Sequence, residues 1–375
     1  MNPKSFLVLL LFAGAAAAQA EPRRIDDLLK PIVEKQHVPG MVAALVEGDH
    51  VTAIGAAGVR KNGGEKAVTI DDQFHLGSDT KAMTATLIGM LVEEGKLSWT
   101  STMSELFPDL ADNMHPDWQK VTVEQLLTHQ AGAPAHLETA PIWGKLWNFK
   151  GPLTKARRDV VEYVLSRPPE AQPGTKFIYS NAGYVMAGAI IEKITNKPWE
   201  DFIRERLFEP LGMKSAGFGA PGERKSESQP WGHSADGAAI SPGPRADNPP
   251  AIGPAGTVHC NITDWAKFIS LHLTGEKGGS KLLKAETFKK LHTPVGKYAM
   301  GWGVDKRDWA GKSGRVLHHA GSNTMWFAVV WIAPDENFAV LVMCNKADPA
   351  AQKACDQAVQ ALIHERAKGN PVAED

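Results

Sequence analysis

The sequence has very few cysteines and almost no net charge. Three cysteines occur in 375 residues, and 41 Lys and Arg stand against 42 Asp and Glu, which leaves a net charge of −1 without a basic cluster. Nucleic-acid binding is excluded as a main role, because phosphate contacts need many Lys and Arg side chains. None of the cysteines lies beside a His at metal-ligand spacing. We therefore expect no metal and no cofactor.

Two of the cysteines are close in sequence. Cys344 ends an apolar strand pattern and Cys355 lies in the helical pattern that follows, whereas Cys260 stands apart. A disulfide between Cys344 and Cys355 and a pair of buried free thiols are both compatible with this spacing.

Several motifs are also absent. The chain contains no H-E-x-x-H, no phosphate-loop pattern and no repeat with a period of about 20 to 50 residues. It lacks G-x-S-x-G, and this excludes the usual nucleophile elbow of α/β-hydrolases.

Long apolar segments are missing after the first twenty residues. Lys4, the thirteen-residue apolar run 6–18 and the small-x-small site Ala18-Gln19-Ala20 predict a signal peptide over residues 1–20. Thirteen residues are too few to span a bilayer, which needs about 20. Loss of Lys4 changes the net charge from −1 to −2. We expect the mature chain in the periplasm or secreted, without stable membrane insertion.

Strand patterns occur near both ends of the chain, with helical patterns between them. We predict an α+β fold in which residues 21–85 and 286–375 build an antiparallel sheet flanked by helices. A mostly helical insertion covers residues 86–285, and the active site lies between the two. The insertion includes 221–256, a stretch with seven Pro and six Gly that is either a wall of the site or a flexible linker. The expected strands are 41–46, 50–54, 298–304, 315–319, 325–332 and 338–344. The expected helices include 25–33, 82–97, 123–127, 157–165, 182–195, 265–273 (with Asp264 as N-cap) and 350–367.

The most informative stretch is residues 74–81, which ends in Ser78-Asp79-Thr80-Lys81 and runs into an apolar-periodic segment. Ser78 and Lys81 share one face when they open a helix, so the amine can reach the hydroxyl. Serine needs such a base to act as a nucleophile. Gly77 permits a tight strand-to-helix turn, and one apolar stripe of the helix should face a core. We therefore expect a buried helix whose reactive N-terminus lies at the floor of a cleft. The alternative is an ordinary polar helix start.

A second stretch is Tyr179-Ser180-Asn181, which precedes a helical pattern. A phenol has a pKa near 10, and a neighbouring ammonium such as that of Lys81 would favour its anion. The alternative is a tyrosine that packs on Phe177 and an asparagine that bonds to the backbone.

A third stretch is His318-His319-Ala320-Gly321-Ser322, at the end of a predicted strand. Gly321 would let the backbone approach a ligand, and the Ser322 amide could then donate to an oxyanion together with the Ser78 amide. His319 is a candidate for orienting a polar group of the substrate or for moving protons. The alternative is a strand-end histidine with a satisfied side chain.

The order of the three stretches resembles the serine β-lactamase and penicillin-binding-protein superfamily. Tyr179 in the second stretch resembles the branch of class C β-lactamases, D-alanyl-D-alanine carboxypeptidases and family VIII esterases. The resemblance implies that Ser78 forms an acyl-enzyme while Lys81 and Tyr179 share its proton. It also implies that Asn181 holds a substrate carbonyl or amide and that the amides of residues 78 and 322 hold the oxyanion.

One departure from the family pattern concerns the substrate. Where β-lactamases of this kind carry Lys-Thr-Gly, this chain has His319-Ala320-Gly321, which removes a permanent cation that would hold a carboxylate. We therefore expect an exported serine hydrolase acting on a small ester, amide or peptide, as a carboxylesterase or D-Ala-type peptidase rather than an efficient β-lactamase. The alternative is a penicillin-binding or cell-wall-peptide-sensing protein of the same fold that does not turn over.

Overall fold

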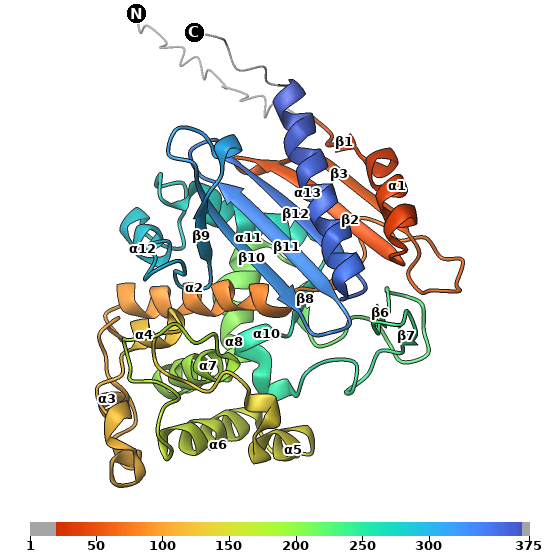
Figure 1. Ribbon diagram of the computed structural model, residues 1–375. Helices are drawn as coiled ribbons and strands as arrows, with labels where there is room; N and C mark the ends of the chain where they lie inside the picture. The colour runs from red at the N-terminus through yellow and green to blue at the C-terminus, as the bar shows by residue number, and fades with distance from the viewer. Residues whose placement is uncertain (1–19, 370–375) are drawn as a thin grey trace, which may run out of the picture.

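A seven-stranded sheet forms the centre of the protein in the computed structural model, which describes residues 20–369 (Figure 1). The strand order is β1-β3-β2-β12-β11-β10-β9. The strands of this sheet are β1 (Arg23–Arg24), β2 (Gly40–Glu47), β3 (His50–Gly58), β9 (Gly303–Lys306), β10 (Arg315–Ser322), β11 (Phe327–Ala333) and β12 (Phe338–Cys344). Two small sheets contain β4 (Phe74–His75), β5 (Gly217–Phe218), β6 (Gly232–His233), β7 (Ala239–Ile240) and β8 (Val258–Cys260).

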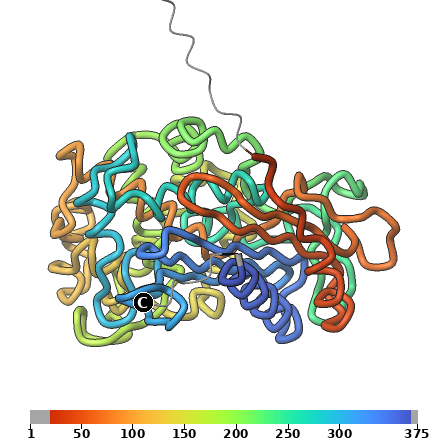
Figure 2. Tube along the Cα trace, turned by 90° about the horizontal axis from the view of Figure 1, so that it is seen from above, coloured from red at the N-terminus to blue at the C-terminus, as the bar shows by residue number. Residues whose placement is uncertain are grey.

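The sheet joins the two ends of the chain. β2 and β12 pair antiparallel with Val42 opposite Met343, so N-terminal and C-terminal strands lie side by side (Figure 2). The predicted α+β fold is therefore confirmed. Only the two-residue β1 runs parallel to its neighbour, β3.

Helices cover both faces of the sheet, which explains why its strands are almost continuously apolar. Val42 and Ala44 pack in one core together with α2, whereas Met41 and Ala43 pack in a second core with α1 and α13. The period of two along β2 thus separates the two cores. The helices are α1 (Asp26–Gln36), α2 (Thr80–Glu93), α3 (Met103–Leu106), α4 (Val123–Leu127), α5 (Pro141–Trp147), α6 (Leu153–Leu165), α7 (Asn181–Thr195), α8 (Trp199–Ile203), α9 (Glu209–Leu211), α10 (Gly253–Gly256), α11 (Ile262–Gly275), α12 (Ala285–Leu291) and α13 (Pro349–Gly369).

α2 is buried on all sides rather than along one stripe. Every residue from Thr80 to Leu91 is buried, because α7, α10 and α12 contact the helix around its circumference. A helix that is apolar all round is a core helix. The expected buried helix is therefore present, and its burial extends beyond the one predicted apolar stripe. The start of α2 lies at the junction of the sheet with the helical region (Figure 1).

Two predicted boundaries differ from the structure. Residues 298–302 form a tight turn rather than a strand, in which Ala299 N–H donates to Trp302 O at 2.7 Å, and β9 begins only at Gly303. The turn carries Tyr298 into the core. α11 is capped by Asn261, whose Oδ1 accepts from Asp264 N at 2.9 Å. Asp264 lies in the first turn of that helix and accepts instead from Ser215.

The segment 221–256 is folded onto the rest of the protein. It contains β6, β7 and α10, and α10 packs against α2 and α7. The division of the chain into a sheet part, residues 21–85 and 286–375, and a helical part, residues 86–285, stays a prediction. α11, which that division assigns to the helical part, packs on β2 and β12.

The three cysteines are buried free thiols, and Cys344 on β12 and Cys355 on α13 are not bridged. The predicted signal peptide lies outside the described residues except for Ala20. Between residues 20 and 369, no helix has the length and apolarity that crossing a membrane requires. The same part of the chain contains no group of three His, Cys, Asp or Glu side chains placed to hold a metal ion.

Candidate active site

Ser78 lies in a one-turn 3-10 helix, Gly77–Asp79, between β4 and α2. Gly77 has a left-handed φ of 52°, and a Cβ there would lie 2.3 Å from Ser322 N. A Cβ on Gly321 would in turn lie 2.6 Å from Ser78 N. These contacts are far too short for any side chain, so both positions need glycine. The two glycines bring the amides of Ser78 and Ser322 to one junction between the nucleophile turn and β10.

A buried chain of polar groups holds this turn in place. Gly77 N–H donates to Nδ1 of His75 at 3.0 Å, so the proton of the neutral imidazole is on Nε2. That nitrogen donates to Asp247 Oδ2 at 2.8 Å, and Asp247 Oδ1 accepts from Asn323 Nδ2 at 2.9 Å. Asp247 belongs to the segment 221–256, which therefore supports the nucleophile turn.

Lys81 lies one turn after Ser78 with its side chain fully buried. Its Nζ is 3.0 Å from Ser78 Oγ, 2.7 Å from Asn181 Oδ1 and 2.8 Å from the carbonyl oxygen of Ala255. Burial lowers the pKa of Lys81 to about 7, although Asp79 opposes this shift. The amine is therefore available in its neutral form near physiological pH.

The three neighbours of Lys81 Nζ differ in what they can do. The oxygens of Asn181 and Ala255 only accept hydrogen bonds, whereas the Ser78 hydroxyl can also donate. A neutral amine has two N–H groups and one lone pair. When the two N–H groups go to the two carbonyl oxygens, the lone pair faces the Ser78 hydroxyl. This is the geometry of a general base next to a nucleophile.

Tyr179 reaches the same serine from the turn before α7. Its phenol forms a hydrogen bond with Ser78, and its ring lies 4.7 Å from Lys81 Nζ. Burial raises the pKa of Tyr179 well above 10. The expectation that Lys81 favours the phenolate was wrong, because desolvation is the largest effect on the pKa of Tyr179 and it disfavours the anion. Tyr179 is a neutral phenol and a proton donor.

His129 holds Tyr179 in place and was not predicted as a site residue. Its carbonyl oxygen accepts from Ile178 N at 2.8 Å, its Nδ1 accepts from Ser180 N at 3.1 Å, and its ring lies 4.4 Å from the Tyr179 ring. Burial lowers the pKa of His129, so the imidazole is neutral. The Leu-Leu-Thr-His-Gln-Ala-Gly stretch at 126–132 was the signal in the sequence. Phe177 contacts His129 and Tyr298 rather than Tyr179.

Asn181 is the first residue of α7, and its Oδ1 is occupied by Lys81. Ser180 caps the helix: its Oγ accepts from Gly183 N at 3.2 Å and donates to Pro134 O at 2.7 Å. With its oxygen facing Lys81, the side-chain NH₂ of Asn181 is the group left to donate to a carbonyl. Ser78, Tyr179 and Asn181 are all partly exposed.

His319 points inward from β10. Its imidazole is buried, and Nε2 lies 3.0 Å from the Tyr298 hydroxyl. Burial lowers its pKa to about 3, so the ring carries no positive charge at neutral pH. Its polar neighbours include Tyr298 and Asp79, and its ring lies 6.4 Å from the Tyr179 ring. A direct contact with substrate stays a prediction. The next residues on the strand alternate, with Gly321 buried against the nucleophile turn and Ser322 exposed.

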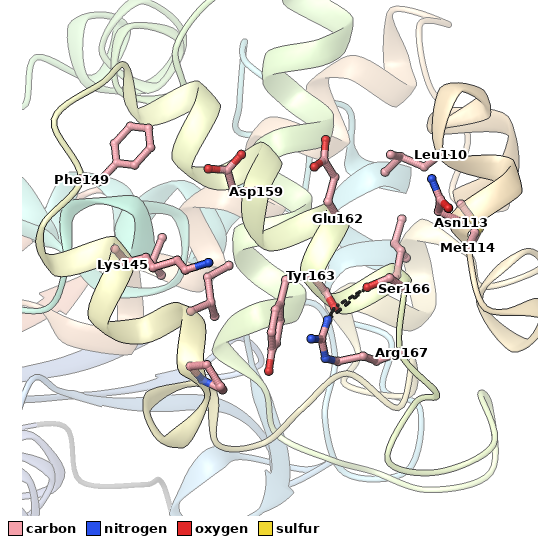
Figure 3. Close-up of a pocket in the computed structure, with 14 residues that line it drawn as sticks. Leu110, Asn113, Met114, Lys145, Phe149, Asp159, Glu162, Tyr163, Ser166 and Arg167 are labelled. Atoms are coloured by element: carbon pink, nitrogen blue, oxygen red, sulfur yellow. Dashed lines mark hydrogen bonds between the residues drawn. The ribbon is translucent and has the colours of Figure 1, made fainter.

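A separate hollow of about 480 Å³ lies in the helical region (Figure 3). Lys145, Asp159 and Glu162 line it together with apolar side chains from α5 and α6. The Tyr163 carbonyl at its edge accepts from Ser166 and Arg167. None of its lining residues belongs to the cluster around Ser78, and its serine, Ser166, accepts from the guanidinium of Arg167, which cannot act as a base.

Comparison with known proteins agrees with this geometry. The chain is 28% identical over 85% of its length to Unguisins hydrolase ungD' from Aspergillus campestris (strain IBT 28561), and it spans about 60% of that protein. It is 29% identical over 83% of its length to Penicillin-binding protein 4 from Amycolatopsis lactamdurans, of which it spans 82%. The D-amino acid amidase of Ochrobactrum anthropi SV3 has the same fold, with a TM-score of 0.73, 20% identity and coverage of 91% of this chain and 97% of that one.

The family match covers most of the chain. The sequence matches the Beta-lactamase family over residues 25–364, which includes all three motif stretches. The resemblance predicted from Ser78, Tyr179 and His319 is confirmed, and the chain belongs to the β-lactamase family.

Proposed function

We propose that this protein is an exported serine hydrolase that forms an acyl-enzyme on Ser78 and hydrolyses esters or amides. The observation that carries this proposal is the convergence of Lys81 Nζ and the Tyr179 phenol on one hydroxyl oxygen. The leader pattern at residues 1–20 supports export, which places the enzyme in the periplasm or outside the cell. The mass of the exported protein tests the proposal of export with removal of residues 1–20. A protein that still begins at Met1 would contradict it.

The first chemical step follows from the protons around Ser78. Neutral Lys81 accepts the hydroxyl proton while Oγ attacks the carbonyl carbon of the substrate. The negative charge that develops on the carbonyl oxygen is placed between the amides of Ser78 and Ser322, and the NH₂ of Asn181 supports a second polar group.

The second step needs a proton donor for the leaving group. Tyr179 is a neutral phenol in contact with Ser78 Oγ, and Oγ is bonded to the carbon from which the leaving group departs. Its proton passes to the leaving oxygen or nitrogen, and the ammonium of Lys81 replaces the lost proton. A water molecule then attacks the acyl-enzyme, with the same groups moving the proton in the opposite direction.

The surroundings of the site favour a substrate that carries no charge in the part that lies beside His319. His319 stands where a lysine would hold a carboxylate, and it is buried, uncharged and bonded to Tyr298. Phe177, 46% exposed, adds an apolar ring next to Tyr298 and His129. Esters and neutral amides fit these surfaces better than a penicillin or cephalosporin carboxylate does. A relative named as a hydrolase and a structural neighbour named as an amidase support the same choice.

Multiple turnover of a short-chain p-nitrophenyl ester tests the proposal. We expect steady release of p-nitrophenol far beyond one equivalent per enzyme, and faster turnover of the ester than of nitrocefin. A D-Ala-D-Ala peptide in the same panel decides between an esterase and a peptidase. A burst of one equivalent without further release would contradict the hydrolase proposal and indicate a penicillin-binding protein that is acylated once.

Replacement of Tyr179 with Phe is expected to lower kcat by about 10²-fold or more, because the donor for the leaving group is lost. The ring contacts with His129 remain, so the thermal unfolding midpoint should change little. Tyr163→Phe is the matched control, since this half-buried tyrosine on α6 lies outside the Ser78 cluster. Near-normal turnover in Tyr179→Phe would remove the phenol from the mechanism.

A further inference from the structure

The two amides that are proposed to hold the oxyanion come from separate parts of the fold. The Ser78 amide belongs to the nucleophile turn, and the Ser322 amide lies at the end of β10. Gly77 and Gly321 let the two segments touch, and this contact limits how closely they approach but does not keep them from separating. In the described part of the chain, no backbone hydrogen bond joins the nucleophile turn to β10. Because an oxyanion needs both donors at hydrogen-bond distance, a link that resists separation is needed as well.

Asp247 supplies such a link. Its Oδ2 accepts from His75 Nε2 at 2.8 Å, and Nδ1 of the same ring accepts from Gly77 N–H at 3.0 Å. Its Oδ1 accepts from Asn323 Nδ2 at 2.9 Å, and Asn323 follows Ser322 directly in the sequence. All three side chains of this chain of hydrogen bonds are buried, where such bonds are strong and costly to break. The chain therefore connects the residue before one oxyanion amide with the residue after the other.

The direction of each hydrogen bond in this chain follows from backbone groups. The Gly77 amide can only donate, so Nδ1 of His75 is an acceptor and the single ring proton is on Nε2. At the other end, Asn323 Oδ1 accepts from the backbone amides of residues 325 and 326, both at 3.1 Å, so its NH₂ faces Asp247. Asp247 thus receives a donor at each oxygen, and the ionised carboxylate is the form that accepts at both.

We propose that Asp247 is a positioning residue for the proposed hydrolysis, and that it holds the two halves of the oxyanion site at a fixed spacing. Its buried carboxylate acts through His75 on the nucleophile turn and through Asn323 on the end of β10. The spacing matters most once the carbonyl oxygen of the substrate has become an oxyanion. Interactions that are made in the transition state raise the reaction rate more than they raise substrate binding. Asp247 should therefore control the rate of attack by Ser78.

Replacement of Asp247 with Asn keeps the shape of the side chain and creates a conflict at one end of the link. The amide has one acceptor oxygen and one NH₂ donor. With the NH₂ toward Asn323, two donors face each other there. With the NH₂ toward His75, the ring proton must move from Nε2 to Nδ1, where it faces the Gly77 N–H. Either orientation pushes one of the two amides away from the other.

We expect Asp247→Asn to lower kcat/KM for a p-nitrophenyl ester by about 10²-fold, the effect of a displacement of about 1 Å at a reacting centre. The second-order rate constant for labelling of Ser78 by a fluorophosphonate should fall by a similar factor, because that reaction also places charge on an oxygen in the oxyanion site. Labelling should still reach one per chain. Asp236→Asn is the matched control and should leave both rate constants unchanged, since this exposed aspartate of the segment 221–256 accepts from groups of its own turn.

A second variant breaks the link at its other bond. Asn323→Asp places two carboxylates face to face, while the amides of residues 325 and 326 keep their acceptor, and it should slow labelling as Asp247→Asn does. In the double variant, the new Asn oxygen can accept from His75 and its NH₂ can donate to the new carboxylate. We expect the double variant to react about tenfold faster than either single variant. Recovery is incomplete because the Asn248 N–H, which donates to Asp247 at 2.7 Å, loses its acceptor.

Three results would overturn this inference. Labelling of Asp247→Asn within about twofold of the parent rate would show that the link does not set the spacing. A lower final extent of labelling with an unchanged rate constant per labelled site would show that only the amount of folded protein has changed. A double variant no faster than the single variants would show that the bond between residues 247 and 323 is not what matters. Should the variants not fold, the nitrogen NMR spectrum of the histidine-labelled parent decides, and a proton on Nδ1 of His75 refutes the link.

This inference rests on the proposed function, but the two fail differently. If the parent is acylated once and does not turn over the ester, the hydrolase proposal fails, while the labelling rates still test the role of Asp247. If the parent turns over the ester and Asp247→Asn is labelled as fast as the parent, the role of Asp247 fails alone.

Discussion

Substitution of Ser78 by Ala is expected to reduce ester hydrolysis by about 10⁴-fold or more. No acyl-enzyme can form without the hydroxyl, and the neighbouring polar groups then surround a substrate that nothing attacks. The small methyl group fits the partly exposed position, so the fold should be unaffected. Steady-state hydrolysis of a p-nitrophenyl ester measures the loss.

A covalent probe locates the nucleophile independently of turnover. A fluorophosphonate should add one label per chain, and peptide mapping should place it on Ser78. Ser166→Ala is the matched control, because this exposed serine accepts from the Arg167 guanidinium at 3.1 Å, which keeps its proton and cannot act as a base. This variant should leave labelling intact. Labelling that persists in Ser78→Ala would show that a different residue reacts.

Loss of Lys81 is expected to be nearly as severe and to change the pH dependence. In the parent enzyme the neutral amine is the active form, so kcat/KM should fall about tenfold per pH unit below a pKa of about 7 and level off above it. Lys81→Met should have a kcat/KM lower by about 10³-fold or more at pH 8. Its residual kcat/KM should not show the fall at low pH, which is the acid limb of the parent profile. Lys81→Arg should be equally poor, because a guanidinium keeps its proton at every working pH.

The matched control for these measurements is Lys96→Met, since Lys96 is exposed just after the end of α2. It should retain both the rate and the acid limb. An acid limb that survives in Lys81→Met, or a parent profile that is flat between pH 5 and 8, would assign the proton transfer to another group.

The elements that follow from local pattern were predictable. The hairpin around Gly48 and the β11–β12 turn were expected from alternating apolar residues separated by turn formers, and β2, β3, β11 and β12 are present. The capping box at the start of α4 follows from the local sequence as well, because Gln125 stands three residues after Thr122. The contact between Ser78 and Lys81 was predictable as well, because the two residues lie three positions apart on one helical turn.

The parts that depend on distant segments were not predictable. Tyr298 was assigned to a strand, but a turn stabilised by Gly301 carries it to His319, and only the folded chain shows this. Asp247 meets His75 across 172 residues of sequence, and nothing local marks either of them. A buried α2 was expected, but its burial beyond the predicted apolar stripe arises from helices that pack on it later in the chain. The direction of the pKa shift of Tyr179 was predicted wrongly for the same reason, since desolvation is a property of the folded state.

The support that segment 221–256 gives to the catalytic turn has a practical consequence for protein engineering. Asp247 reaches Gly77 through His75, and the Ala255 carbonyl fixes the amine of Lys81. Loop grafting that aims to change the substrate range must therefore keep these two anchor points in register. A library that randomises the whole segment would mostly yield inactive clones, whereas one that leaves Asp247 and α10 intact samples new entrances around a preserved reaction centre.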